Sequence, residues 1–112
     1  MITWRGREYR CAVEVSMNVL SGKWKCLMLW HLHDGAMRYK DLEQIVPGVS
    51  QKMLTQQLKE LERDGLLFKT VYPEVPPRVE YELTELGHSA YPILQQMHAW
   101  GVDRLGLVDQ DA

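Results

Sequence analysis

The run from Ser50 to Thr84 constrains the fold of this chain more than any other segment. It opens with Ser50, a favourable N-cap because its side-chain oxygen can accept from the free amides of a first helical turn. Gly65 suits the left-handed position just beyond a helix C-terminus. Between the two, leucines recur at helical spacing on one stripe, which predicts an amphipathic helix over about 50–64 with that stripe buried. The leucines of the stripe are Leu54, Leu58 and Leu61.

Cations and amides occupy the opposite face of this predicted helix. At about 100° per residue, Lys52, Gln56 and Lys59 point away from the leucines, and Thr55 lies on the flank. Amides can pair with adenine edges, ammonium groups with guanine or phosphate, and a threonine methyl with thymine. Any solvated helix also carries lysine and glutamine outside, so this face alone does not distinguish a DNA-reading helix from an ordinary surface helix.

The pattern of a β-hairpin follows the helix at once. Residues 78–84 alternate apolar and polar side chains with a period of two, as a half-buried strand does, and residues 67–72 form a compatible partner. Between them, Pro73, Pro76 and Pro77 prevent ladder pairing and stiffen the tip. Arg78 at the base of this tip is placed to contact a minor groove or phosphates, although a stiff hairpin can also be only a loop closure.

The residues before Ser50 read as short helical segments. Helices are predicted over 11–20, 23–33 and 39–46, with a short strand near 37–39 and a turn at 47–49. The whole order is helix, helix, short strand, helix, turn, helix and hairpin. We therefore predict an α+β fold that is mainly α, a winged helix-turn-helix in a single domain over 1–112, with a recognition helix over about 50–64 and a wing over about 67–83.

The C-terminal segment from about 84 to 107 is helical in pattern, with a broad apolar stripe and a kink expected at Pro92. A domain of this size cannot easily cover both that stripe and the apolar residues Trp4, Tyr9 and Val13 near the other terminus. We expect these terminal segments to act as dimerisation helices in a homodimer with two-fold symmetry. Its two DNA half-sites would then lie about one or two turns apart. The alternative is that the last helix packs only on its own domain. The stripe consists of Leu86, Ala90, Ile93, Leu94, Met97, Trp100 and Leu105.

Charge and hydropathy restrict the possible partners. A net charge of −2 does not favour a generic polyanion binder, and residues 50–80 hold five cations and five anions. Binding to DNA would therefore depend on charges sorted by face, which fits a sequence-specific dimer. No apolar stretch approaches the roughly 18 residues of a membrane span, and the N-terminus lacks the hydrophobic region of a signal peptide. We expect a soluble, cytoplasmic protein without a membrane partner.

Three segments closely resemble the HxlR-type (MarR-like) bacterial transcriptional regulators. They are CAVEVSMNVLSGKWKCLMLWHL, RYKDLEQIVPGVSQKMLTQQLKELERDGLL and VYPEVPPRVEYELTELG. The resemblance runs from about Cys11 to Gly101, and the GKW, PGVSQKMLTQQLKELE and PPRVEYELTELG motifs are individually uncommon. It implies a homodimeric winged-helix DNA-binding protein that acts as a repressor or activator and is not an enzyme. It places the recognition helix at Ser50–Asp64 and the wing at Leu67–Leu83.

These observations together predict a set of DNA contacts and a partner. The partner is a palindromic double-stranded operator, and no cofactor or metal is expected. A competing hypothesis is a winged-helix module that contacts protein or RNA, since fold does not fix function. No pattern of nucleophile, base and orienting acid and no Gly-rich phosphate loop favours an enzyme. The predicted DNA contacts are Ser50, Gln51, Lys52, Thr55, Gln56, Lys59, Arg78, Lys23 and Lys25.

Cys11 is a candidate for regulation, because it begins the first predicted helix directly after Arg10. A helix N-terminus and a nearby guanidinium both favour the thiolate form. Relatives that resemble this chain often carry a cysteine here, and several use it to sense oxidants or electrophiles, although this chain has Ala12 where many have proline. The hypotheses are a redox-sensing Cys11 with a small oxidant or electrophile as effector, and an unreactive thiol.

The second cysteine, the histidines and several aromatic residues are expected to have structural roles. Cys26 lies among Trp24, Leu27 and Trp30 and is expected to be a small core residue. The spacing of the four histidines does not predict a metal site. Four aromatic residues could wall a cavity between the terminal helices that admits an aromatic ligand, but aromatic residues at such spacing more often belong to a core. They are Trp4, Trp30, Tyr91 and Trp100.

Overall fold

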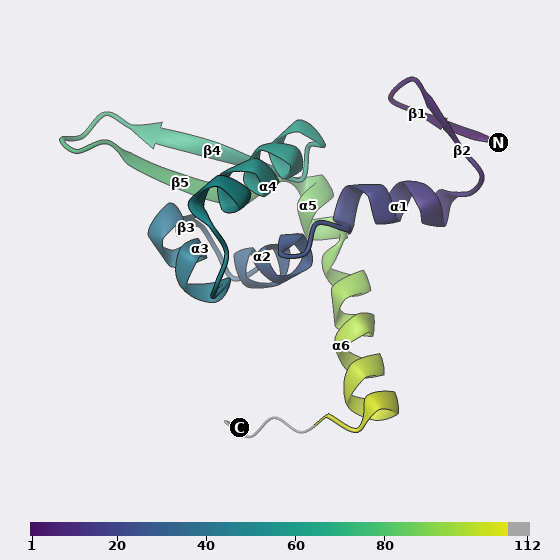
Figure 1. Ribbon diagram of the computed structural model, residues 1–112. Coiled ribbons are helices and arrows are strands. Elements are labelled where there is room, and N and C mark those ends of the chain that lie inside the picture. The colour runs from purple at the N-terminus through teal and green to yellow at the C-terminus, as the bar shows by residue number, and fades with distance from the viewer. Residues whose placement is uncertain (108–112) are drawn as a thin grey trace.

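The computed structural model describes residues 1–107, which form helices and two small antiparallel sheets. The elements in chain order are β1 (Ile2–Trp4), β2 (Arg7–Tyr9), α1 (Ala12–Leu20), α2 (Lys25–Leu32), β3 (Met37–Arg38), α3 (Tyr39–Ile45), α4 (Gln51–Arg63), β4 (Leu67–Tyr72), β5 (Arg78–Leu83), α5 (Glu85–Ser89) and α6 (Tyr91–Leu105). Figure 1 shows α2, α3 and α4 grouped at the centre. The β4–β5 hairpin projects to one side, while α1 and the β1–β2 hairpin extend to the other and α6 runs away from the body.

Helix α4 begins and ends as the sequence predicts. The Ser50 side chain accepts a hydrogen bond from the amide of Met53 at 3.0 Å, and Gly65 adopts a φ of 82° just past the helix. The predicted leucine stripe is at most 2% exposed, which confirms its burial. It packs into a core with leucines and a methionine from the neighbouring helices. These partners are Met28, Leu29 and Leu32 of α2 and Leu42 of α3.

The wing predicted over 67–83 is the hairpin of β4 and β5. Its register runs from Leu67 opposite Leu83 to Tyr72 opposite Arg78. The short strand β3 pairs with the other edge of β5, so the sheet order is β3-β5-β4. Leu67 and Leu83 at the root are buried in the core, whereas residues 73–77 at the tip are exposed. The core therefore anchors the wing at one end and leaves its tip free.

The C-terminal segment differs from its prediction. Residues 84–107 were expected to form one helix kinked at Pro92, but the structure has two helices that meet at Ala90. Pro92 lies in the first turn of α6, where a proline is tolerated because that amide has no intrahelical acceptor. Thr84 starts α5 by accepting from the amide of Gly87 at 3.0 Å, and its hydroxyl donates to the carbonyl of Gly65. The helical segment is therefore interrupted at Ala90, where α6 turns away from the wing.

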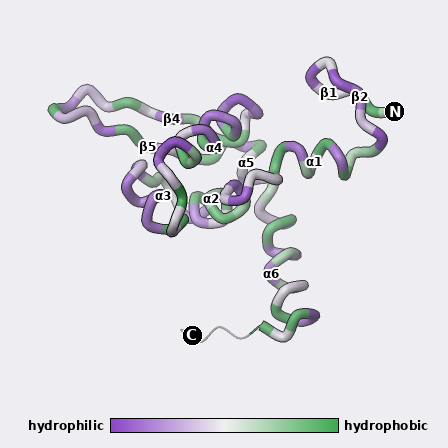
Figure 2. The backbone as a smooth tube through the Cα atoms, viewed as in Figure 1, coloured by the Kyte–Doolittle hydropathy of each residue, from purple (hydrophilic) through white to green (hydrophobic). Residues whose placement is uncertain are grey.

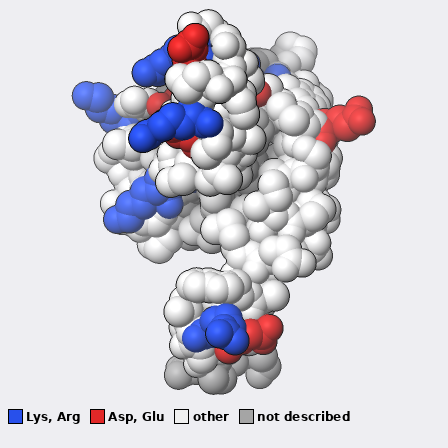
Figure 3. Space-filling view, turned by 90° about the vertical axis from the view of Figure 1, so that its right-hand side faces the viewer, with Lys and Arg blue, Asp and Glu red and all other residues white. Residues whose placement is uncertain are grey.

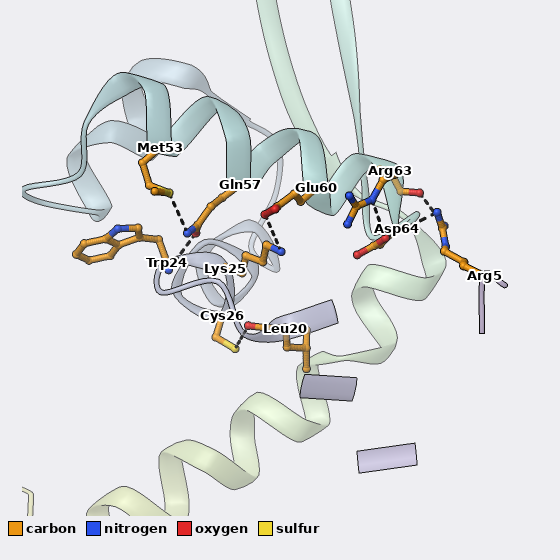
Figure 4. A network of polar contacts seen from close by, with 10 residues as sticks. All are labelled: Arg5, Leu20, Trp24, Lys25, Cys26, Met53, Gln57, Glu60, Arg63 and Asp64. Atoms are coloured by element: carbon orange, nitrogen blue, oxygen red, sulfur yellow. Dashed lines mark hydrogen bonds and ion pairs between the residues drawn. The ribbon is translucent and has the colours of Figure 1, made fainter. Parts of the chain in front are cut away.

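The β1–β2 hairpin was not predicted from the sequence. Its strands pair from Ile2 opposite Tyr9 to Trp4 opposite Arg7, so Arg5 and Gly6 form a two-residue turn. Both have positive φ, 50° and 75°, as a type I′ turn requires. The Arg5 guanidinium donates to the carbonyl of Arg63 at 2.7 Å and lies 3.8 Å from the carboxylate of Asp64 (Figure 4). This contact joins the hairpin to the C-terminal end of α4.

Apolar residues are not confined to the core. Figure 2 shows hydrophobic positions along α1 and α6, beyond the central helices. On α1, Val13 and Met17 are exposed, and on α6 so are Ile93, Met97 and Trp100. Within residues 1–107, no helix has the length and apolar character needed to cross a bilayer.

Candidate nucleic-acid interface

The outward face of α4 borders an open hollow with a volume of about 630 Å³. Two residues of α3, Tyr39 and Glu43, form the opposite wall. The α4 residues that line the hollow are all exposed and are all predicted contacts. They are Gln51, Lys52, Thr55, Gln56 and Lys59. The fold therefore brings five of the predicted DNA contacts together on one surface, because their helix buries its leucines on the other side.

Most side chains on this surface remain available to a partner. Within the described part of the chain, no ion pair engages Lys52 or Lys59. Thr55 is the exception, because its hydroxyl lies 3.2 Å from the hydroxyl of Tyr39, which also donates to the carbonyl of Gln51 at 3.2 Å. Ser50 is exposed next to this surface while its oxygen caps α4.

Lys25 does not belong to the interface, which corrects one prediction. Its side chain is 4% exposed, and its ammonium lies 3.0 Å from the carboxylate of Glu60 (Figure 4). A buried lysine paired in this way cannot reach a phosphate. Lys23, two residues earlier, is exposed and lies 4.8 Å from the centre of the Trp24 ring. The backbone amide of Trp24 donates to the buried side chain of Gln57 at 3.1 Å, so Lys23 stands beside α4.

Arg78 lies at the start of β5, as predicted, but it is held by acidic neighbours. Its guanidinium lies 3.4 Å from Glu74 and 3.2 Å from Glu80, and it stacks 3.9 Å above the Tyr72 ring. Its side chain is 29% exposed. To bind a phosphate, Arg78 would have to exchange at least one carboxylate for the new anion.

Two basic residues beside Arg78 were missed by the sequence reading. Arg38 and Lys40 are exposed at the start of α3 and, with Arg78 and Pro77, line a second hollow of about 250 Å³. Strand β3 brings them there, because Arg38 pairs with Glu80 across the sheet. Tyr39 lines both hollows, so the basic surface continues from α4 to the base of the wing. The sequence Arg38-Tyr39-Lys40 predicts the short strand and the start of the next helix, but its two cations were not among the predicted DNA contacts.

The two cysteines differ in environment. Cys11 is exposed at the N-cap of α1, as predicted, but Arg10 pairs with Glu14, whose carboxylate lies 3.6 Å from the guanidinium. That carboxylate also accepts from the Arg10 amide at 2.9 Å. Cys26 is half-buried against the core, its thiol 3.5 Å from the carbonyl of Leu20 (Figure 4), and burial raises its pKa. Cys26 therefore packs against the core, as expected, but lies at its edge and is not fully buried.

Two of the four aromatic residues expected to wall a cavity stack on one another. Trp30 stacks on Tyr91 with ring centroids 5.2 Å apart, and Tyr91 stacks on His33 at 3.4 Å. Trp100 is 60% exposed, and Trp4 borders a separate hollow between α1 and α5. The predicted aromatic walls therefore do not enclose one common cavity. Among residues 1–107, no three His, Cys, Asp or Glu side chains lie close enough to hold a metal ion.

Comparison with known proteins identifies the family. Residues 19–108 match the HxlR-like helix-turn-helix family. The chain belongs to the HxlR family of transcriptional regulators. YtcD of Bacillus subtilis strain 168, an uncharacterised helix-turn-helix transcriptional regulator, is 47% identical over 105 residues, or 94% of this chain and 83% of that protein. The fold and family predicted from the sequence are thereby confirmed.

Solved structures agree with this assignment. The crystal structure of ytcD matches with a TM-score of 0.82 and 46% identity, over 87% of this chain and 99% of that one. The redox regulator HypR in its oxidised form matches with a TM-score of 0.79 and 44% identity, over 88% of this chain and 99% of that one. HxlR proteins are transcriptional regulators and not enzymes, so the surface of α4 is the place to seek a DNA contact.

Proposed function

We propose that this HxlR protein binds a palindromic operator in double-stranded DNA as a homodimer, with α4 in the major groove. The observation that carries the proposal is the exposed row of Gln51, Lys52, Thr55, Gln56 and Lys59 around an open hollow, on a helix whose other face is core. Amides and ammonium groups match the edges of bases and the phosphates of a groove. The wing and the cations Arg38, Lys40 and Arg78 add contacts along the backbone.

Residues that read a base and residues that bind phosphate should respond differently to substitution. Gln56→Ala removes an amide that reads a base, so sequence preference relaxes at one position of each half-site. Lys59→Ala removes a phosphate contact, so binding to every sequence weakens and the salt slope of log K falls by about 0.9 per contact. Selection from a random duplex pool measures the first effect, and binding at several salt concentrations measures the second.

A matched control removes the same charge elsewhere. Arg7 is exposed on β2 and does not line the hollow beside α4, so Arg7→Ala should leave both preference and salt slope unchanged. If the wild-type protein selects no palindrome and Lys59→Ala binds duplex DNA as tightly as the wild type, operator binding is rejected. A winged-helix module for protein or RNA contact is then the better explanation.

We also propose that Cys11 makes the regulator responsive to an oxidant or electrophile. Cys11 is exposed, and HypR, a redox regulator, is 44% identical to this chain. Treatment with diamide or a quinone should change the operator affinity of the wild type, and Cys11→Ser should abolish that change. Cys26→Ser is the control and should keep the response, because burial raises the pKa of Cys26 and so disfavours its reactive thiolate. An undiminished response in Cys11→Ser removes Cys11 from the mechanism.

A further inference from the structure

A chain of hydroxyl groups links the start of α3 to the outward face of α4. The Tyr39 oxygen lies 3.2 Å from the carbonyl oxygen of Gln51 and 3.2 Å from the hydroxyl oxygen of Thr55. Tyr39 begins α3, and all three residues border the hollow of about 630 Å³. The bridge therefore lies within the surface that the proposed operator would cover.

The chemistry of the three groups fixes the direction of both hydrogen bonds. A carbonyl oxygen can only accept, so the single hydroxyl proton of Tyr39 goes to Gln51. With that proton committed, the contact with Thr55 requires the Thr55 hydroxyl to donate to the Tyr39 oxygen. Thr55 has one hydroxyl proton, and this arrangement directs it toward the protein.

The exposed part of Thr55 then has a defined character. It offers lone pairs and a methyl group to the hollow, but no hydrogen-bond donor. In a major groove, lone pairs match the amino groups of adenine and cytosine, and a methyl matches that of thymine. Guanine presents the acceptors O6 and N7 there, which need a donor.

We infer that Tyr39 is a positioning residue for base readout, which holds Thr55 as an acceptor and methyl group and so disfavours guanine at the base that Thr55 faces. The inference rests on the proposed function, because it requires α4 to lie in a major groove. It adds that Tyr39 of α3 helps to set the operator sequence without having to contact a base.

The Tyr39→Phe variant tests this inference, because it keeps the ring and removes only the hydroxyl. The Thr55 proton is then free to donate outward. Selection from a random duplex pool should show a gain for guanine of about two- to tenfold at one position of each half-site, the worth of one hydrogen bond. Preferences elsewhere and the salt slope should not change. A purely structural role for Tyr39 would instead weaken binding to all sequences alike.

A double-variant comparison provides the control. Thr55→Val keeps the branched shape and the methyl group but replaces the hydroxyl with a second methyl, so adding Tyr39→Phe to it should not alter base preference. The inference is overturned if Tyr39→Phe leaves every position unchanged in a protein that still selects an operator, or if its effect persists in the Thr55→Val background.

Two further outcomes separate this inference from the proposed function. If Tyr39→Phe does not fold, as thermal unfolding would show, Thr55→Val and Thr55→Ser locate the base that responds to Thr55. Wild-type preference against guanine there supports the inference, and a preference for guanine contradicts it. If the wild type selects no sequence at all, operator binding fails and this inference fails with it.

Discussion

At the scale of single residues, Lys25 shows what a sequence pattern misses. Lys23 and Lys25 flank Trp24, and both were expected on the DNA side. Lys23 lies in the turn before α2, whereas Lys25 is the first residue of α2, so the two side chains need not share one surface. The structure exposes Lys23 and turns Lys25 inward to Glu60, at 3.0 Å. Burial of an ammonium group is tolerated because its partner carboxylate lies on α4.

Because Lys25 is buried and pairs with Glu60, substitutions at Lys25 should change stability without changing DNA binding. A buried ion pair can be replaced as a whole by apolar residues at little cost, so the double variant Lys25→Met/Glu60→Leu should change the free energy of unfolding by about 1 kcal/mol or less, whereas Lys25→Met alone leaves Glu60 without its partner. Lys25→Glu would place a second carboxylate beside Glu60 and should cost about 3–5 kcal/mol. Thermal unfolding measures both changes. The salt slope of DNA binding should not change in Lys25→Met, and a slope reduced as in Lys59→Ala would show that Lys25 reaches the phosphates.

At the scale of elements, the sequence predicted what short-range patterns encode. The helix over 50–64 and the wing over 67–83 follow from a cap, a leucine stripe and an alternating strand, and all of these appear in α4, β4 and β5. The β1–β2 hairpin was missed because its strands have three residues each and its turn is Arg5-Gly6. The common signal for a type I′ turn is Asn-Gly or Asp-Gly. Its contact with Asp64 joins residues far apart in sequence, which no local pattern reveals.

Packing of α5 against the wing predicts the effect of a change at Gly87. A Cβ atom at this buried glycine would lie 2.0 Å from the carbonyl oxygen of Leu66 and 3.2 Å from the Cβ of Leu83. The Leu66 carbonyl is backbone and already accepts from the amide of Thr84 at 3.0 Å, so it cannot move aside cheaply. Gly87→Ala should therefore destabilise the fold by about 3 kcal/mol or more.

Thermal unfolding measures the effect of Gly87→Ala, with a variant on the same helix as its control. Ser89 is exposed at the end of α5, and Ser89→Ala should change stability by about 0.5 kcal/mol or less. A Gly87→Ala protein as stable as the wild type would mean that α5 can shift away from the wing. In that case the close contact between Gly87 and the Leu66 carbonyl would not hold α5 in place against the wing.

At the scale of the whole molecule, the chain is more extended than a compact monomer. Its radius of gyration is 15.6 Å, against about 13 Å for a compact domain of this length. Its accessible surface is 8059 Å², against about 6,400 Å² for a compact monomer of 13.1 kDa. The excess exceeds the roughly 800 Å² that each partner buries in a standard interface. The proposed homodimer would bury part of this excess surface.

We expect the proposed homodimer to use the apolar surface between α1 and α6. These helices border an apolar hollow of about 470 Å³, lined among others by Val13, Met17, Ile93 and Met97. In Figure 3, which shows this side of the molecule, charged side chains gather on the upper part and at the lower end, and the surface between them carries almost none. The sequence predicted the apolar stripe of α6, but Leu94 and Ala90 are buried within the chain and leave the rest of the stripe exposed.

This surface predicts that Met97→Glu converts the protein to a monomer. Met97 is 53% exposed, so the substitution spares the core of the single chain, while in a two-fold dimer it places an unpaired carboxylate at the interface twice. The dimer dissociation constant should rise by more than about 100-fold, or about 2.7 kcal/mol, and affinity for the palindrome should fall toward that of one half-site. Val71→Glu is the control, because Val71 is 58% exposed on the wing. Sedimentation should find Val71→Glu dimeric and Met97→Glu monomeric, and a dimeric Met97→Glu protein would place the interface elsewhere.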